Sequence, residues 1–145
     1  MARLSKFTRH ADAITDGTEV EVGPKSDRFI LVTRGMTDAY SDRLWELRRL
    51  ATIEYNAGLT RDDVRAVPQD LPPSIDDRCV AQALGEKCLI DVRDLEGDDG
   101  AAITIDAFRD MITRRENVIL LRLTLEAVSS VGTEEKKVLA DAEKN

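Results

Sequence analysis

The sequence is short of aromatic residues, histidine and cysteine. Aromatic residues make up 4% of its 145 residues, and it has one histidine, one tryptophan and two cysteines. A core must therefore be built mainly from Leu, Ile, Val and Ala, a set that favours packed helices. No apolar run reaches the roughly 20 residues of a membrane span, and the N-terminus lacks the apolar stretch of a signal peptide. We expect a soluble protein that stays in the cytoplasm.

The motifs of common enzyme active sites are also missing. Nucleophilic catalysis needs a base beside the nucleophile, and His10, the only histidine, lies in a weakly patterned N-terminus. Neither a G-x-x-x-x-G-K phosphate loop nor an H-E-x-x-H zinc motif occurs. Carboxylates are plentiful, but they follow no metal-ligand spacing. We predict a protein that is not an enzyme and that uses no cofactor.

The two cysteines do not suggest a disulfide or a metal site. Cys79 and Cys88 are nine positions apart on a predicted helix, which places them on opposite faces. They can therefore neither bridge nor share a metal there. We predict two buried, inert thiols in a reducing compartment.

Negative charge predominates, and it is concentrated in the middle of the chain. The formal net charge is -7, and acidic residues outnumber basic ones twelve to five between residues 51 and 100. Binding to nucleic acid depends on neutralising phosphates with Lys and Arg. The charge balance therefore argues against nucleic acid as the main partner.

The most acidic stretch is DVRDLEGDDG, residues 91–100. A calcium loop of the EF-hand kind requires glycine at its sixth position and glutamate at its twelfth. Counted from Asp94, these positions hold Asp99 and Ile105, so the motif fails twice. We interpret the stretch as an acidic turn between two helices and assign no metal ligand to it.

Two short β-rich runs lie near the N-terminus. In residues 18–22, Thr and Val side chains alternate with glutamates. Residues 23–27 are typical of a turn, and residues 28–33 form a second β-rich run. This pattern predicts a β-hairpin. Because two strands alone are marginal in water, the hairpin must rest on helices or pair with another chain.

The remaining pattern is helical. Thr37 is placed to cap a helix over residues 38–57, and Thr104 to cap another, with Ile103 and Phe108 as its hydrophobic staple. Ser74 and Asp77 resemble a capping box for a helix that continues toward Val92. Residues 67–73 hold three of the four prolines and predict an extended connector. Residues 118–131 are apolar most of the way round, as in a central helix or one that binds a partner.

These elements define the expected fold. We predict a mainly α (α+β) fold, a small helical domain of about four to five helices with an N-terminal two-stranded β-hairpin. The single domain spans residues 1–145, with its parts in this order: an N-terminal arm (1–17), the β-hairpin (18–33), an all-α body (37–131) and a C-terminal tail or short helix (132–145).

Three strings of the sequence together resemble tail assembly chaperones of long-tailed bacteriophages and related prophages. The strings are KFTRHADAITDGTEVEVGP, VTRGMTDAYSDRL, and the acidic stretch followed by AAITIDAFRDMI. They contain a short β element, a helix that begins near an "aY" pair, a "D-V-R-x-L…D-D-G" turn and a "T-x-x-x-F" helix start. The residues that match these features are Ala39, Tyr40, Asp91, Val92, Arg93, Leu95, Asp98, Asp99, Gly100, Thr104 and Phe108.

The resemblance implies a helper protein of the infected cell's cytoplasm, without catalytic residues. Such a protein is expected to bind the tape-measure protein, to keep it soluble and to let tail-tube subunits assemble around it. Self-association into a homo-oligomer is also open. The contact surface hypothesised from the apolar pattern consists of Trp45, Ile119, Leu120 and Leu123. The alternative is that these four residues belong to the core, with Trp45 at its edge.

Two other functions compete with this one. A structural virion protein, such as a head-tail connector, a tail-completion protein or a capsid-decorating protein, would share the small size and could dock through the hairpin. A phage-encoded regulator that binds host protein or DNA would use Arg43, Arg48 and Arg49 as its basic face, although no recognition motif accompanies them.

The interpretation of residues 91–100 predicts that calcium leaves the stability of the protein unchanged. The melting temperatures of the parent and of the Asp98→Asn/Asp99→Asn variant are measured with and without calcium. For each protein, the two values are expected to be the same. A calcium-dependent rise in the parent that the variant loses would instead establish a cation site.

Overall fold

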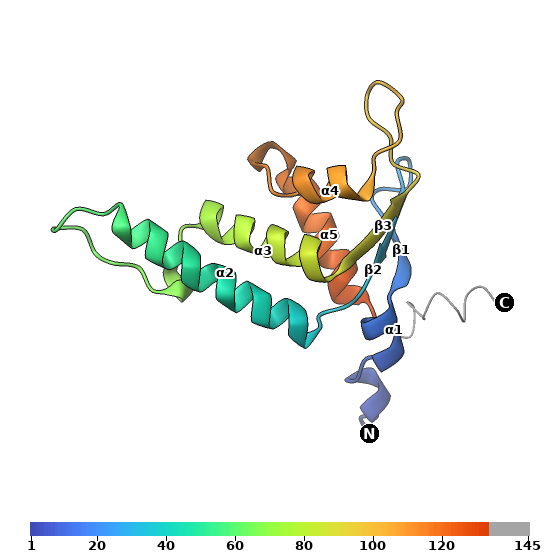
Figure 1. The fold of residues 1–145 in the computed structure, drawn as a ribbon. Coiled ribbons are helices and arrows are strands. Elements are labelled where there is room, and N and C mark those ends of the chain that lie inside the picture. The colour runs from blue at the N-terminus through green and yellow to red at the C-terminus, as the bar shows by residue number, and fades with distance from the viewer. Residues whose placement is uncertain (134–145) are drawn as a thin grey trace.

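The structure, a computed structural model, describes residues 1–133. Residues 134–145, most of the predicted tail, lie outside the described residues. The described part is an α+β fold in which helices α3, α4 and α5 lie beside a three-stranded sheet (Figure 1). Its elements are α1 (Ala11–Asp16), β1 (Thr18–Val22), β2 (Phe29–Thr33), α2 (Asp38–Ala57), α3 (Pro73–Lys87), β3 (Leu89–Arg93), α4 (Ile105–Met111) and α5 (Val118–Ser130), with short 3-10 turns at Leu4–Lys6, Pro68–Asp70 and Arg115–Asn117.

The sheet is antiparallel, with strand order β1-β2-β3. The β1–β2 hairpin was predicted, and it is confirmed by the pairing of Val20 with Leu31. Leu31 also pairs with Val92 of β3, and all three side chains are buried on the inner face. On the outer face, the side chain of Arg93 forms an ion pair with Glu19 across the sheet. The alternation seen in the sequence therefore separates a buried face from a charged one.

The third strand corrects the prediction of an all-α body over residues 37–131. Helix α3 ends at Lys87, and residues 89–93 pair with β2 instead of continuing the helix toward Val92. Leu89 and Val92 are three positions apart, a spacing that fits one face of a helix. In the strand they share a face only because of a β-bulge opposite Val32 and Thr33. Pairing with β2 satisfies backbone groups at an edge that a two-stranded hairpin would leave open.

The acidic stretch 91–100 is likewise not a turn between two helices. Its first three residues belong to β3, and residues 94–104 form a hairpin-like loop that projects at the top of Figure 1 before α4 begins. Within this loop the backbone N–H of Gly97 donates to the carbonyl of Ala101, at 2.9 Å, and that of Ile103 to the carbonyl of Leu95, also at 2.9 Å. Gly100 has φ +82°, a left-handed conformation that glycine adopts without steric cost.

Two of the three predicted helix caps are present. The Thr37 hydroxyl accepts from the N–H of Tyr40 at 3.2 Å, and the Thr104 hydroxyl from the N–H of Ala107 at 3.1 Å. The prediction of a capping box formed by Ser74 and Asp77 is wrong, since no side chain caps the start of α3. Helix α3 begins at Pro73, because proline is preorganised for the first turn of a helix.

One hydrophobic cluster joins the sheet to the helices. The ring of Phe108 on α4 lies 6.1 Å from that of Phe29 on β2, and Leu31, Leu84 and Val128 are fully buried around them. The guanidinium of Arg109 donates to the carbonyls of Gly85 and Leu89, at 2.8 and 3.0 Å. It therefore ties α4 to the junction between α3 and β3.

Replacement of Leu121 by aspartate tests the placement of α5 in the core. Leu121 is 6% exposed, so Leu121→Asp would bury an unpaired carboxylate and remove apolar contacts. The expected loss of unfolding free energy is about 3 kcal/mol or more. Urea denaturation measures it, with Arg122→Asp at the exposed neighbouring position as the control. Equal stabilities of the two variants would contradict this packing.

Candidate functional site: a groove between two helices

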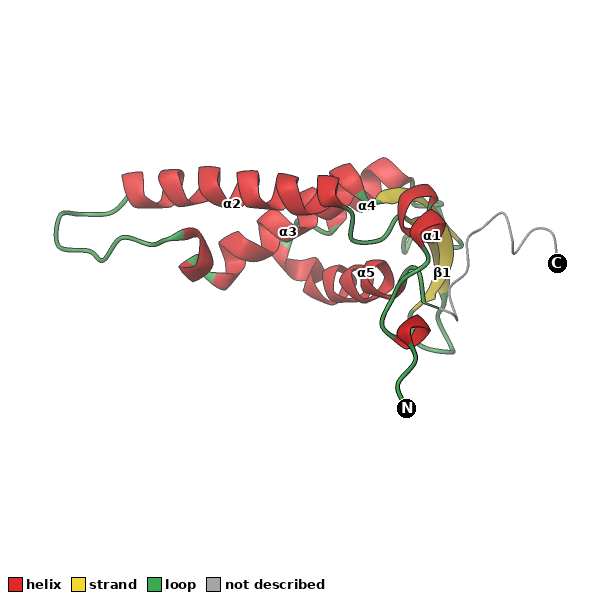
Figure 2. Cartoon of the chain, turned by 90° about the horizontal axis from the view of Figure 1, so that it is seen from below, coloured by secondary structure: helices red, strands yellow, loops and turns green. Residues whose placement is uncertain are grey.

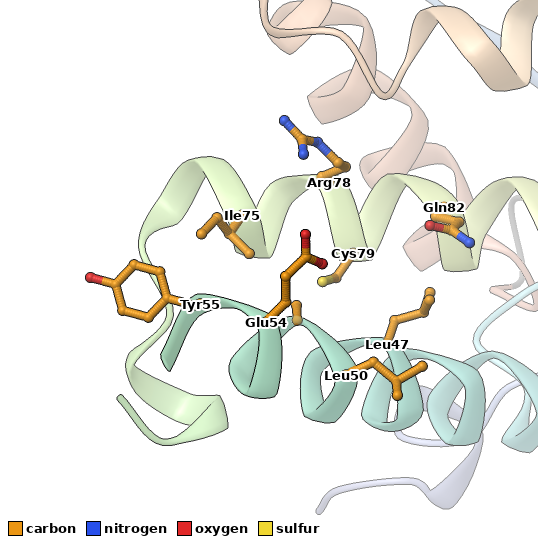
Figure 3. Close-up of a pocket in the computed structure, with 9 residues that line it drawn as sticks. Leu47, Leu50, Glu54, Tyr55, Ile75, Arg78, Cys79 and Gln82 are labelled. Carbon is orange, nitrogen blue, oxygen red and sulfur yellow. The ribbon is translucent and has the colours of Figure 1, made fainter. Parts of the chain in front are cut away.

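Helices α2 and α3 form a hairpin that extends away from the sheet (Figures 1 and 2). An open groove of about 340 Å³ runs between them. Figure 3 shows its lining, in which Leu47, Leu50, Ala51, Glu54 and Tyr55 come from α2 and Ile75, Arg78, Cys79 and Gln82 from α3.

Helical spacing and side-chain size explain the groove. The lining residues of each helix recur every three to four positions, so they share one face over about two turns. Two of them, Ala51 and Cys79, have small side chains that cannot fill the space between the helices. Leu50, another lining residue, is 46% exposed. The groove is thus a concave, largely apolar surface that the described part of the chain leaves uncovered.

Polar contacts hold the two walls in place. The Arg48 guanidinium donates to both carboxylate oxygens of Asp76, at 2.7 and 3.2 Å, and Arg43 does the same to Glu86, at 2.7 and 3.3 Å. The hydrogen bond from Arg43 lowers the pKa of Glu86. Each ion pair is partly exposed and stabilises the fold only slightly. Its two hydrogen bonds nevertheless fix the orientation of α2 relative to α3.

The loop that joins the helices is also fixed at its base. The Asn56 side-chain amide donates to the carbonyl of Ala66 and accepts from its N–H, both at 2.9 Å. This double hydrogen bond imitates a backbone pairing, so it returns the chain toward α3. The groove is therefore preformed at its distal end as well.

The groove contains one thiol. Burial raises the pKa of Cys79, and the nearby carboxylate of Asp76 raises it further. A raised pKa keeps the thiol protonated near neutral pH, so it offers an apolar contact in preference to a reactive thiolate. The structure brings no histidine to the groove within residues 1–133, since His10 precedes α1.

Both cysteines are free and buried, as predicted, but they do not share a helix. Cys88 follows the end of α3 and donates from its thiol to the carbonyl of Gly35 at 3.4 Å. Burial raises the pKa of Cys88 to about 12.

The four residues of the hypothesised contact surface do not come together. Trp45 is 66% exposed on α2 and Ile119 is 70% exposed on α5, whereas Leu120 and Leu123 are half-buried against the core. Helix α3 lies between α2 and α5 in both views (Figures 1 and 2). Trp45 is not at the edge of the core, because it is mostly exposed, and the Arg49 guanidinium lies 5.8 Å from the centroid of its ring.

The groove itself was not predicted. The four-residue spacing of Leu47 and Ala51 indicates that they share one face of the first long helix, but it does not show which part of that face the second helix leaves open. The available signal is the pair of small residues, Ala51 and Cys79, within two apolar stripes. These two residues indicate a groove only when it is known which residues of α2 face which residues of α3.

Neither a metal centre nor a membrane span is visible in the described residues. Within residues 1–133, no three His, Cys, Asp or Glu side chains gather closely enough to hold a metal ion. No helix in the same range has the length and apolar character needed to cross a bilayer. Comparison with protein-family models, curated proteins and solved structures finds no match to this chain.

Thiol labelling tests the placement of the two cysteines. At pH 8 maleimide is expected to modify Cys79 slowly, because its pKa is raised, and to spare Cys88 until the protein unfolds. The Cys79 rate should rise about tenfold per pH unit below its pKa, as the thiolate fraction does. Intact mass spectrometry follows the reaction, and Cys79→Ala and Cys88→Ala assign the products. Equal native rates at both thiols would contradict the structure.

Proposed function

We propose that this protein is a non-catalytic tail assembly chaperone of a long-tailed bacteriophage. In this proposal it acts in the host cytoplasm, where it holds an apolar helical segment of the tape-measure protein in the α2–α3 groove. The observation that carries the proposal is the open apolar groove on a projecting helical hairpin. The resemblance of the sequence to this family supports the choice of partner.

The form of the groove favours a helix as its occupant. Its walls are side chains of two antiparallel helices, which offer few hydrogen bonds to an extended backbone. A helix satisfies its own backbone groups, so it can enter without leaving polar atoms unpaired. A third helix in this position would cover the exposed part of Leu50.

The size of the groove suits temporary binding. A groove of this volume contacts only a few side chains, so each site is expected to bind weakly. A chaperone must release its partner when tail-tube protein assembles around it, and weak contacts repeated along a long helix allow that release. The tail-tube protein is accordingly the second proposed partner.

A structural virion component is the alternative, and the sheet edge is the observation that favours it. Strand β1 is an edge strand of the sheet within residues 1–133, and edge strands are where a strand from a neighbouring subunit can be added. However, Glu19 and Glu21 place charge along β1, a feature that discourages edge-to-edge pairing. The apolar groove therefore carries the preferred proposal.

Copurification tests the proposed function. The protein would be expressed together with the tape-measure protein of the same phage, and the complex isolated through a tag on either component. Leu50→Asp is expected to reduce the recovered complex at least about tenfold, because it places a carboxylate in the apolar groove. Ile53→Asp is the matched control, since Ile53 is an exposed apolar residue of the same helix outside the groove lining.

Melting curves of the two variants check that both fold. Unchanged recovery with folded Leu50→Asp would remove the groove from the binding surface. Absence of any complex with the unmodified protein would contradict the choice of tape-measure protein as partner.

A further inference from the structure

The two charged residues of the groove lining, Glu54 and Arg78, come from opposite walls. Figure 3 shows the Glu54 side chain reaching from α2 toward α3, and the Arg78 side chain extending from α3 on the side away from α2. Neither residue forms an ion pair within the part of the chain that the structure describes. Across the groove, the acidic side chain therefore lies nearer α2 than the basic one, which borders the groove on α3.

The neighbouring charges make this pair distinctive. Arg43 is paired with Glu86 and Arg48 with Asp76, and both pairs link α2 to α3. Those four charges are thus already neutralised within the hairpin. Glu54 and Arg78 line the groove with their charges uncompensated, so they are available to an occupant.

Opposite charges on the two flanks distinguish the two directions in which a helix can lie. Reversal of an amphipathic helix with its apolar stripe facing the groove exchanges its left and right flanks. Flanking charges beside an apolar seam set partner choice and orientation in the same way in coiled coils. Only one direction would place a basic residue of the occupant near Glu54 and an acidic residue near Arg78.

We propose that Glu54 and Arg78 fix the direction of a bound amphipathic helix, and that this helix carries a basic flank facing α2 and an acidic flank facing α3. This inference rests on the proposed function, because it takes the groove as a helix-binding site. It adds the chemistry of the occupant: an apolar stripe of about two turns between flanks of opposite charge.

The test uses a synthetic helical peptide with a leucine stripe, a lysine flank and a glutamate flank, and no aromatic residue. One version carries a dansyl group at its N-terminus and the other at its C-terminus. Trp45, the only tryptophan, is the natural energy donor, and it lies on α2 toward the body relative to the groove residue Glu54. The peptide end nearer the body is therefore expected to show more energy transfer.

The charge-exchanged variant Glu54→Lys/Arg78→Glu is expected to invert the order of energy transfer between the two labelled peptides. Peptides with lysine on both flanks, or with glutamate on both, are expected to bind the parent about threefold to tenfold more weakly than the mixed peptide. The control is Arg61→Glu/Asp62→Lys, which exchanges two exposed charges in the loop of the same hairpin and keeps the net charge. It should leave both results unchanged.

The outcomes separate this inference from the proposed function. Peptide binding with the same transfer order in parent and variant would overturn the role of Glu54 and Arg78 while leaving the groove as a helix-binding site. No binding of any peptide would overturn both. A dimer of this chain, seen by sedimentation and dissociated by the peptide, would make a second copy of this chain the occupant, and would also overturn the proposal.

Discussion

The pairing of β3 with β2 is the contact on which the rest of the structure depends. It converts a marginal hairpin into a sheet with a buried face, against which α4 and α5 pack. It also fixes the point where α3 ends, since the N–H of Arg34 donates to the carbonyl of Cys88 at 2.9 Å. Arg109 holds the same junction from α4. The α2–α3 hairpin is thus anchored at its base, where α3 meets the sheet.

Because its base is anchored, the α2–α3 hairpin can project from the sheet although the space between its two helices is not filled. The helices are held by arginine–carboxylate pairs and by the contacts of buried residues such as Leu47, while Ala51 and Cys79 leave space between them. Larger residues at these two positions would fill the groove and add buried apolar area. The chain therefore forgoes some stability at the place where an occupant would bind.

Local signals in the sequence were sufficient for the elements with strong periodicity and caps. The alternation of residues 18–22 and the Thr37 cap gave β1 and α2 with their observed bounds. Strand β3 was missed because the spacing of Leu89 and Val92 matches one face of a helix. In the strand the two residues share a face only through a β-bulge, which pairing with a strand distant in sequence creates. The groove was missed for a related reason, since it depends on the register between two helices. The exposure of Trp45 likewise depends on what the rest of the fold leaves uncovered.

The abundance of this protein in purified phage particles, compared with the infected-cell lysate, tests the central claim most directly. Peptide mass spectrometry measures both. A chaperone that releases its partner during tail assembly should be abundant in the lysate and absent from the particles. A fixed copy number in finished particles would contradict this account, and it would instead favour a structural component docked through the edge strand β1.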